Sequence, residues 1–199
     1  MNMLRPLAAL AMTLTLAAPA WADKLALTDI SSYLNGIKTA QAKFTQIAGD
    51  GSVSTGTLYL NRPGRMRFEY DPPNESFVLA NNGAVGIFDV KGDPAAETYP
   101  LSRTPLSIIL DEKVDLTRAR MVTGHREDGA KTIVSAQDPA HPEYGSIDLI
   151  FTGSPVELRQ WVVHDDSGSA TTIVLGDMQT GIRLGRDLFD FNKPQGGDR

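Results

Sequence analysis

The chain has 199 residues, of which 24 are acidic, 19 are basic and none is cysteine, and its formal net charge is −5. An acidic surface repels the phosphates of nucleic acids and offers no polybasic attachment to a membrane, so both kinds of electrostatic partner are excluded. The lack of cysteine excludes disulfide bonds and the lipid-modified cysteine that anchors a bacterial lipoprotein.

The first 22 residues have the pattern of a secretory signal peptide. Arg5 gives the positive start, residues 7–18 form a short apolar core, and the AWA sequence at residues 20–22 fits a small-residue cleavage site. The apolar run is shorter than the roughly 20 residues that a membrane-spanning helix needs. We therefore expect cleavage after Ala22, a single domain over residues 23–199, and a mature protein that is in the periplasm or secreted.

Residues 23–39 have the spacing of an amphipathic helix. Thr28 or Asp29 is the expected N-cap, because short polar side chains accept hydrogen bonds from the first free amides. The apolar positions recur at i, i+3, i+4 and i+7, which places them on one side of a helix. This stripe consists of Ile30, Tyr33, Leu34 and Ile37.

The most informative segment, residues 56–70, predicts a β-hairpin that turns at Pro63-Gly64. Apolar and polar residues alternate on both arms, as in half-buried strands. The apolar face consists of Leu58, Leu60, Met66, Phe68 and Tyr70. The same alternation puts Arg62 at the rim of this face, where the cation must reach solvent or find acceptors. A nearby carboxylate is the simplest such acceptor.

The other segments are mostly strands. Residues 42–47 precede the hairpin, and residues 77–80 and 85–88 are expected to form a second hairpin about Asn81-Asn82-Gly83. Further strands are expected at residues 97–101, 119–124, 131–136, 146–151, 156–164, 170–177 and 188–191.

A short second helix is expected between the two groups of strands. Thr104 would cap it and Pro105 would occupy its first position, where proline is favourable. Its apolar side consists of Leu106, Ile109 and Leu110. About ten strands with tight turns predict one large antiparallel sheet, which must curl. A curled sheet with a small helical cover leaves an apolar cavity.

Four sequence blocks carry a resemblance to a known family. They are AKFTQ at residues 42–46, Arg62-Pro63 followed by Met66-Arg67-Phe68, Thr104-Pro105-Leu106, and FNKPQG at residues 191–196. In this order, the blocks identify the chain as similar to the LolA family of periplasmic carriers of outer-membrane lipoproteins.

The resemblance implies a mainly β (α+β) fold: a strongly curved, unclosed antiparallel barrel with a lid of short α-helices over an apolar cavity. It implies a monomeric carrier that takes acylated lipoproteins from a LolCDE-type ABC transporter of the inner membrane. The carrier would deliver them to a LolB-type receptor or to the outer membrane. No cofactor, metal or catalytic residue is expected.

The resemblance also assigns roles to individual residues. The family's gating arginine falls on Arg62, which would bond to main-chain carbonyls of the lid in the closed state. The expected lid residues are Ile30, Leu34, Ile37, Leu106, Ile109 and Leu110. The expected cavity residues are Leu58, Leu60, Met66, Phe68, Tyr70, Phe77, Leu79 and Ile87. Met66 and Phe68 also suit an ordinary hydrophobic core.

Two other functions remain open at this point. A related protein of the same fold can bind another lipid in the periplasm, as a carrier or as a sensor that regulates a partner. A lipid hydrolase is the other alternative, but the chain has neither a G-x-S-x-G motif nor a cysteine nucleophile. The His164-Asp165-Asp166 sequence reads as the start of a turn rather than as a metal site, because neighbouring strand residues point to opposite faces.

Overall fold

The computed structural model describes residues 24–74, 76–89, 97–118 and 120–191. The predicted signal peptide and residues 192–196 of the last family block lie outside the described residues. Three α- and 3-10 helical segments belong to the lid region: α1 (Leu27–Gly36), η1 (Leu101–Arg103) and α2 (Leu106–Leu110). Two further 3-10 helices are η2 (Pro142–Tyr144) and η3 (Arg186–Phe189).

The strands precede and follow α2 in two groups. The first group is β1 (Thr39–Ile47), β2 (Val53–Asn61), β3 (Arg65–Tyr70), β4 (Ser76–Asn81), β5 (Ala84–Asp89) and β6 (Glu97–Pro100). The second group is β7 (Val122–Asp128), β8 (Lys131–Gln137), β9 (Ser146–Thr152), β10 (Glu157–His164), β11 (Ala170–Leu175) and β12 (Gln179–Thr180).

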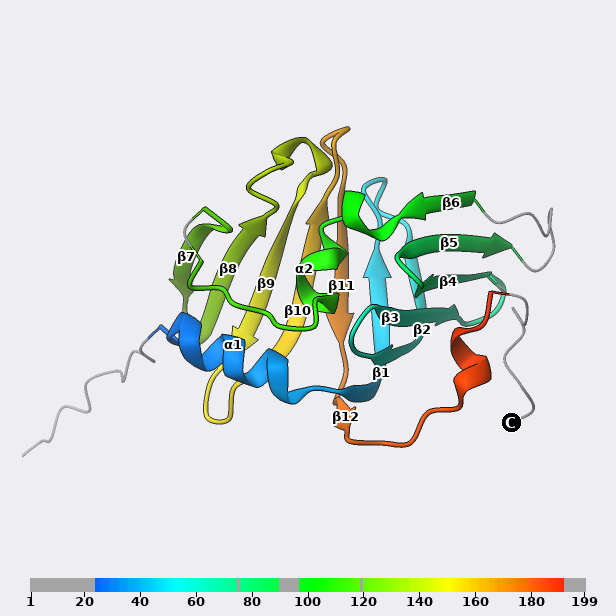
Figure 1. The fold of residues 1–199 in the computed structure, drawn as a ribbon, viewed down its shortest axis with the longest axis horizontal. Coiled ribbons are helices and arrows are strands. Elements are labelled where there is room, and N and C mark those ends of the chain that lie inside the picture. Colours follow the sequence, from blue (N-terminus) through cyan, green and yellow to red (C-terminus); the bar gives the residue numbers. More distant parts are fainter. Residues whose placement is uncertain (1–23, 75, 90–96, 119, 192–199) are drawn as a thin grey trace, which may run out of the picture.

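All twelve strands form one antiparallel sheet, with β6 at one edge and β7 at the other. The order runs β6-β5-β4-β3-β2-β1-β11-β10-β9-β8-β7, and β12 pairs with the start of β1. Neighbouring strands are therefore consecutive in the chain except where β11 and β12 return to β1. The sheet curves strongly without closing, and both α-helices lie on one side of it (Figure 1). This confirms the predicted mainly β, unclosed architecture.

The two predicted hairpins form in the expected register. In the first, Leu58 lies opposite Phe68 and Leu60 lies opposite Met66, so the apolar face is continuous across β2 and β3. In the second, Asn82 and Gly83 both have positive φ angles, 51° and 76°. These angles are what a two-residue turn of the type preferred by Asn-Gly requires.

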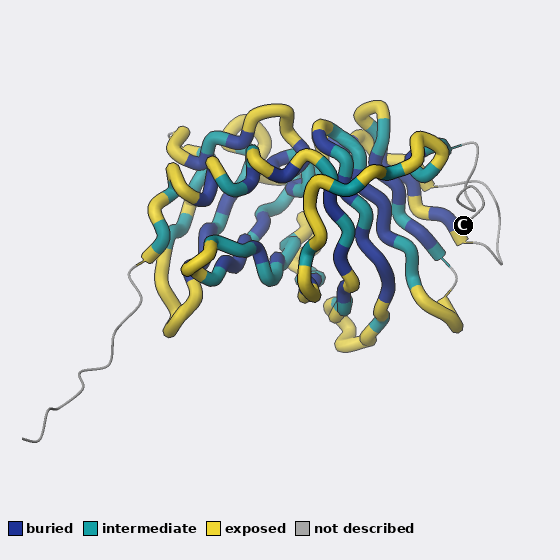
Figure 2. Tube along the Cα trace, turned by 90° about the horizontal axis from the view of Figure 1, so that it is seen from below, coloured by how far each residue is buried: buried dark blue, intermediate teal, exposed yellow. Residues whose placement is uncertain are grey.

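The sheet buries apolar side chains on both faces. The larger cluster fills the concave face beneath α1 and α2 and includes Phe44, Met66, Phe68 and Trp161. A smaller cluster covers the convex face of β3, β4 and β5, where η3 packs on the sheet. Burial follows the middle of the strands, while the exposed residues gather at the turns and rims (Figure 2).

Three local predictions are wrong. The first helix begins at Leu27, and Ala26 occupies its N-cap position without a side-chain hydrogen bond. Thr104 does not cap α2, because its hydroxyl instead donates to the carbonyl of Leu101 at 2.9 Å. Residues 186–189 form the 3-10 helix η3 instead of opening a last strand, since this segment's carbonyls accept hydrogen bonds from side chains rather than from a strand.

Among the described residues, no helix is long and apolar enough to cross a membrane.

Candidate functional site

A small enclosed cavity lies between the helices and the concave face of the sheet. Its volume is about 20 Å³. The lining is apolar except for one arginine and consists of Leu34, Ile37, Leu58, Leu60, Arg62, Met66, Ile109, Leu158, Trp161 and Met178. Leu34 and Ile37 come from α1 and its C-terminal end, Ile109 comes from α2, and most of the others come from the sheet.

The size of this cavity shows whether the lid is open or closed. A water molecule needs roughly 10–15 Å³ of such space, whereas ligand pockets usually measure about 300–1,000 Å³. The cavity of about 20 Å³ therefore has no room for an acyl chain. The structure is a closed form, and the helices must move before the apolar lining can take up a large ligand.

Arg62 joins both helices to the hairpin. It follows the last residue of β2 and is buried, with only 7% of its surface exposed. Its Nη1 donates to the carbonyl of Leu34 in α1, and its Nη2 donates to the carbonyl of Asp111 just after α2 at 2.6 Å. The carbonyl of Leu34 also accepts from the N–H of Ile37 at 3.2 Å. A carbonyl has two lone pairs and carries partial negative charge near the end of a helix, so a guanidinium suits it well.

The acceptors of Arg62 are neutral groups. Within the described ranges, no carboxylate oxygen forms a salt bridge with this guanidinium, so the simple rim ion pair is not formed. Burial lowers the pKa of Arg62, and the negative charge of Asp111 acts in the opposite direction. The cation is held by hydrogen bonds to the lid rather than by a counter-ion.

The turn after Arg62 adds a backbone contact to the same lid. Gly64, with φ of 71°, donates its N–H to the carbonyl of Leu110 at 2.9 Å. Arg62 and Gly64 thus bind consecutive carbonyls, those of Asp111 and Leu110. The β2–β3 turn closes over the C-terminal end of α2.

Asn35 provides a second connection, between α1 and the segment that follows α2. Its side-chain amide donates to the carbonyl of Val114 at 2.7 Å and accepts from the N–H of Val114 at 2.9 Å. Nη2 of Arg62 also lies 3.5 Å from the same Asn35 oxygen. Val114 is buried, so this amide satisfies both main-chain groups of a residue that water does not reach.

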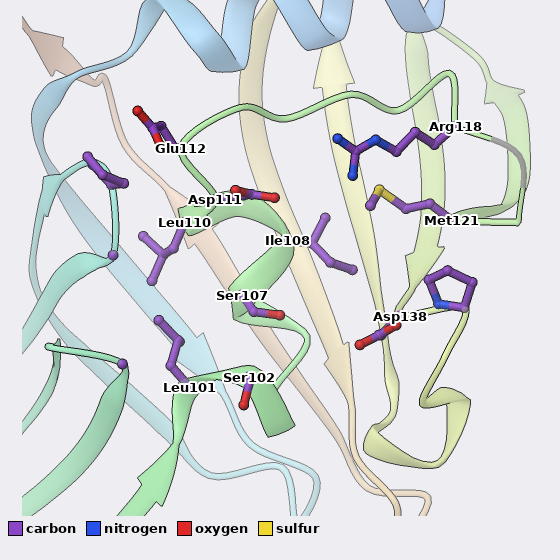
Figure 3. A pocket seen from close by; sticks show the side chains of 14 residues that line it. Leu101, Ser102, Ser107, Ile108, Leu110, Asp111, Glu112, Arg118, Met121 and Asp138 are labelled. Carbon is purple, nitrogen blue, oxygen red and sulfur yellow. The ribbon is translucent and has the colours of Figure 1, made fainter.

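On the other side of α2 lies a larger, open hollow of about 660 Å³ (Figure 3). Ile108 and Leu110 of α2 line it, and Arg118 and Met121 face it from the segment that follows the lid (Figure 3). Since Ile109 lines the enclosed cavity, α2 is a thin partition between the open hollow and the apolar interior.

Most of the residues predicted for the lid and the cavity lie at the interface between the helices and the concave face of the sheet. The residues that line the enclosed cavity include Leu34, Ile37, Leu58, Leu60, Arg62, Met66 and Ile109. Phe68 packs beside them, with its ring 5.2 Å from that of Phe44 and 6.2 Å from that of Trp161. Ile30 and Leu110 are buried and Leu106 is partly buried in the same concave cluster, without lining the cavity.

The prediction that Phe77 and Leu79 line the cavity is wrong. In the ladder, Phe77 lies opposite Glu69 and Leu79 opposite Arg67, so both side chains point to the convex face. They pack there with Phe88 and Phe189, on the far side of the sheet from the cavity. They are part of the convex core and cannot line the predicted site.

For Ile87, the predicted face of the sheet is right but the predicted place in the cavity is wrong. It lies opposite Val78, which in turn lies opposite Phe68, so the predicted concave face is right. However, it is 46% exposed and lines a separate open hollow of about 520 Å³ together with Tyr70 and Val78. Neither Ile87 nor Tyr70 lines the enclosed cavity beneath the helices.

Four site residues were not predicted from the sequence: Leu158, Trp161 and Met178 in the lining, and Asn35 between α1 and the segment that follows α2. Leu158 and Trp161 are three residues apart, which breaks simple alternation. A β-bulge between Leu158 and Gln160 brings both to the same face. Two large apolar residues three positions apart in the predicted strand at residues 156–164 are the signal that could have indicated a bulge.

The histidines do not form a metal site in the part of the chain that the structure describes. His164 lies 3.4 Å from Asp148 on the neighbouring strand, and His125 contacts the carbonyl of Leu25 at 2.9 Å. His141 pairs with Glu143 on the surface at 3.0 Å.

Comparison with known proteins gives concordant results. The chain is 27% identical to the outer-membrane lipoprotein carrier protein of Methylococcus capsulatus, over 85% of this chain and 84% of that protein. It is 28% identical to the protein of the same name from Cupriavidus taiwanensis, over 96% and 93% of the two chains. A DUF1329 family protein from Desulfovibrio piger shares the fold, with a TM-score of 0.51, 11% identity, and coverage of 85% and 96%.

The family model described as "Outer membrane lipoprotein carrier protein LolA" matches residues 35–192. This match includes the hairpin, Arg62, α2 and most of the strands, and it covers well over half of the chain. The chain belongs to the LolA family.

Proposed function

We propose that this protein is a periplasmic carrier that shields the acyl chains of lipoproteins and delivers them to the outer membrane. It acts as a chaperone and not as an enzyme, as its family membership indicates. The observation that supports the proposal most strongly is the apolar cavity closed by two short helices, whose main-chain carbonyls accept hydrogen bonds from one buried arginine.

The energetics of the cargo explain why an apolar lining is sufficient. Each CH₂ group moved from hydrocarbon into water costs about 0.8 kcal/mol, so one long acyl chain costs on the order of 10 kcal/mol. A lipoprotein with two or three chains therefore cannot cross an aqueous compartment unaided. Burial of its chains requires apolar area, which the leucines, Met66 and Trp161 provide once the helices move.

Delivery requires that the affinity of the carrier for its lipoprotein cargo be limited. The hydrogen bonds from Arg62 to the carbonyls of Leu34 and Asp111 exist when the lid is closed. Loading breaks them, so their free energy is subtracted from the free energy of cargo binding. The empty, closed form competes with the loaded form, and the cargo can leave for an acceptor that binds it better.

The partners follow from the same proposal. A LolCDE-type ABC transporter of the inner membrane would supply the lipoprotein, and a LolB-type receptor or the outer membrane would accept it. The carrier would work as a monomer after removal of residues 1–22. The names of its relatives as outer-membrane lipoprotein carriers support lipoproteins as the cargo.

A release assay tests the proposal. Spheroplasts that synthesise a labelled outer-membrane lipoprotein are incubated with the purified protein of residues 23–199, and the supernatant is fractionated by size. We expect energy-dependent release of the lipoprotein in a soluble one-to-one complex. If the lipoprotein stays in the membrane although the transporter is active, the carrier function is wrong. Mass spectrometry of any co-purified lipid would then identify another ligand.

A further inference from the structure

One buried polar atom of the site has no partner in the closed form. Arg62 is 93% buried and lines the enclosed cavity, and its two Nη atoms bond to the lid. Its Nε–H has no hydrogen-bond partner among the described residues. It is the one side-chain nitrogen or oxygen atom of the described residues that is fully buried and has no hydrogen-bond partner.

A buried donor without an acceptor is unfavourable, and folded proteins contain few of them. The remaining lining of the cavity consists of leucine, isoleucine, methionine and tryptophan side chains. An apolar cavity with one unpaired cationic donor suits a ligand that is apolar along its length and has an acceptor at one end. An acyl chain has this chemistry, because a carbonyl joins it to the rest of the lipid.

We propose that the Nε–H of Arg62 binds the carbonyl oxygen of a cargo acyl group, so that the site distinguishes acyl chains from plain hydrocarbon chains. This inference rests on the proposed function and assigns a second role to the same arginine. The Nη groups hold the lid when the cavity is empty, and Nε positions the head of a chain when the cavity is loaded.

The position of Arg62 fits this arrangement. The residue lies at the end of β2, next to the turn whose Pro63 and Gly64 line the open hollow on the other side of α2. The apolar residues Leu58 and Leu60 precede it along the strand. A chain that lies along this strand would have its carbonyl at the rim and its hydrocarbon part inside.

Two lipids that differ only in this carbonyl provide the test. A diacylglycerol has ester carbonyls, and a dialkylglycerol of equal chain length has ether oxygens that are much weaker acceptors. Both are used to displace a fluorescent apolar dye from the purified protein of residues 23–199. A hydrogen bond to a charged donor predicts about tenfold tighter binding of the diacyl lipid.

The ratio of the affinities for the two lipids separates the hydrogen bond to the acyl carbonyl from the cost of opening the lid. Opening the lid costs the same for both lipids, so its contribution cancels in the ratio. In Arg62→Leu both lipids should bind, with a ratio close to one. Arg65→Leu is the matched control, because Arg65 lies on the convex side over the Phe189 ring, and it should keep the tenfold preference.

The outcomes separate this inference from the proposed function. Equal affinities in the wild type would overturn the role of Nε and leave the carrier function intact. A preference that persists in Arg62→Leu, or that disappears in Arg65→Leu, would also overturn it. Failure of both lipids to bind the wild type would count against the carrier function itself.

Discussion

Arg62 bonds to main-chain carbonyls of both lid helices, and the neutrality of these acceptors matters for a gate. A buried ion pair that loses one partner is strongly destabilised, because the remaining charge is left in an apolar environment. A hydrogen bond from the guanidinium to a neutral carbonyl costs less to break, about 1.5–3 kcal/mol, than removal of one partner of a buried ion pair, about 3–5 kcal/mol. The guanidinium, already destabilised by burial as its lowered pKa indicates, is then free to bind another acceptor.

Replacement of this arginine should therefore change release more than loading. In Arg62→Leu the closed form loses its hydrogen bonds to Leu34 and Asp111, so the loaded form is favoured. We expect normal formation of the lipoprotein complex and at least about tenfold slower transfer to acceptor membranes. The measurement is the transfer rate from preloaded carrier to vesicles, with Arg65→Leu as the control. Equal rates for Arg62→Leu and wild type would exclude a gating role.

Tyr70 gives the protein a specific alkaline sensitivity. Burial raises the pKa of Tyr70 to about 12, while its hydroxyl donates to the Gln46 side chain at 2.6 Å. The folded state therefore holds this proton more tightly than the unfolded state, whose tyrosine titrates near pH 10. The corresponding stability is fully present below about pH 10 and is lost as the pH rises through about 12.

This effect amounts to about 2–3 kcal/mol of unfolding free energy, and Tyr70→Phe should remove it. Urea unfolding at about pH 9 and about pH 11.5 measures how far the unfolding free energy falls between these pH values in wild type and in Tyr70→Phe. Some alkaline sensitivity should remain in the variant, because burial also raises the pKa of Tyr33. An identical pH slope in Tyr70→Phe and wild type would contradict this assignment.

At the scale of elements, the lid is a set of short segments tied to each other by side chains. α1 has ten residues and α2 has five, too few for either to be stable alone. Ser31 of α1 accepts a hydrogen bond from the N–H of Leu116, and Asn35 pairs with both main-chain groups of Val114. These contacts connect α1 to the segment after α2, so the two helices are expected to open together.

Asn35→Ala tests this connection. The substitution leaves the buried N–H and carbonyl of Val114 unpaired, which should cost about 2 kcal/mol of unfolding free energy. Hydrogen exchange at the Val114 amide should become faster, because the lid opens more often. Asn74→Ala is the control: Asn74 is exposed and bonds to Ser54, so its loss should cost less than about 0.5 kcal/mol. Unchanged exchange at Val114 would show that Asn35 does not hold the lid.

The two faces of the sheet should respond differently to loss of a phenylalanine. Phe68 and Phe77 are both buried, but Phe68 packs on the concave side and Phe77 packs with Phe88 and Phe189 on the convex side. Each change to alanine should destabilise the fold by about 3–5 kcal/mol. Displacement of an apolar dye should show altered lipid affinity in Phe68→Ala only. An equal change in affinity for Phe77→Ala would contradict the placement of this residue.

Alternation along the sequence identified the faces of some strands and not of others. The alternation in residues 56–70 predicted the register of β2 and β3 and the place of Arg62, because polar residues occupy one face throughout. Phe77–Ala80 is apolar at every position, so alternation could not tell which face is concave. That choice is made by pairing with β3, where Val78 lies opposite Phe68. Leu158 and Trp161 were missed because a bulge shifts their alternation.

Contacts between distant segments were equally hard to predict. Asn35 and Val114 lie far apart in the sequence, and neither has a local pattern that points to the other. The resemblance predicted that Arg62 bonds to lid carbonyls, and the structure identifies these carbonyls as those of Leu34 and Asp111. Physical patterning alone would have favoured a carboxylate as partner.

At the scale of the whole molecule, a curved sheet with two free edges provides a rigid half-barrel and a separate, movable cover. The sheet is held by continuous ladders from β6 to β7, whereas the cover depends on a few side-chain and main-chain hydrogen bonds. Segments with few buried hydrogen bonds open at lower free energy than the strands around them. In the proposed function, motion of the cover alone would turn the closed cavity of about 20 Å³ into a site for a lipid.

Displacement of α2 on loading is the most direct test of this account. The chain has no cysteine, so Ser107→Cys in α2 and Val53→Cys at the exposed start of β2 can carry the only two spin labels. The distance between the labels is measured by pulsed electron paramagnetic resonance, with and without a saturating diacylglycerol. We predict a single narrow distance distribution in the empty protein and a shifted, broader distribution in the loaded protein. An unchanged distribution in a sample shown to contain bound lipid would contradict the account.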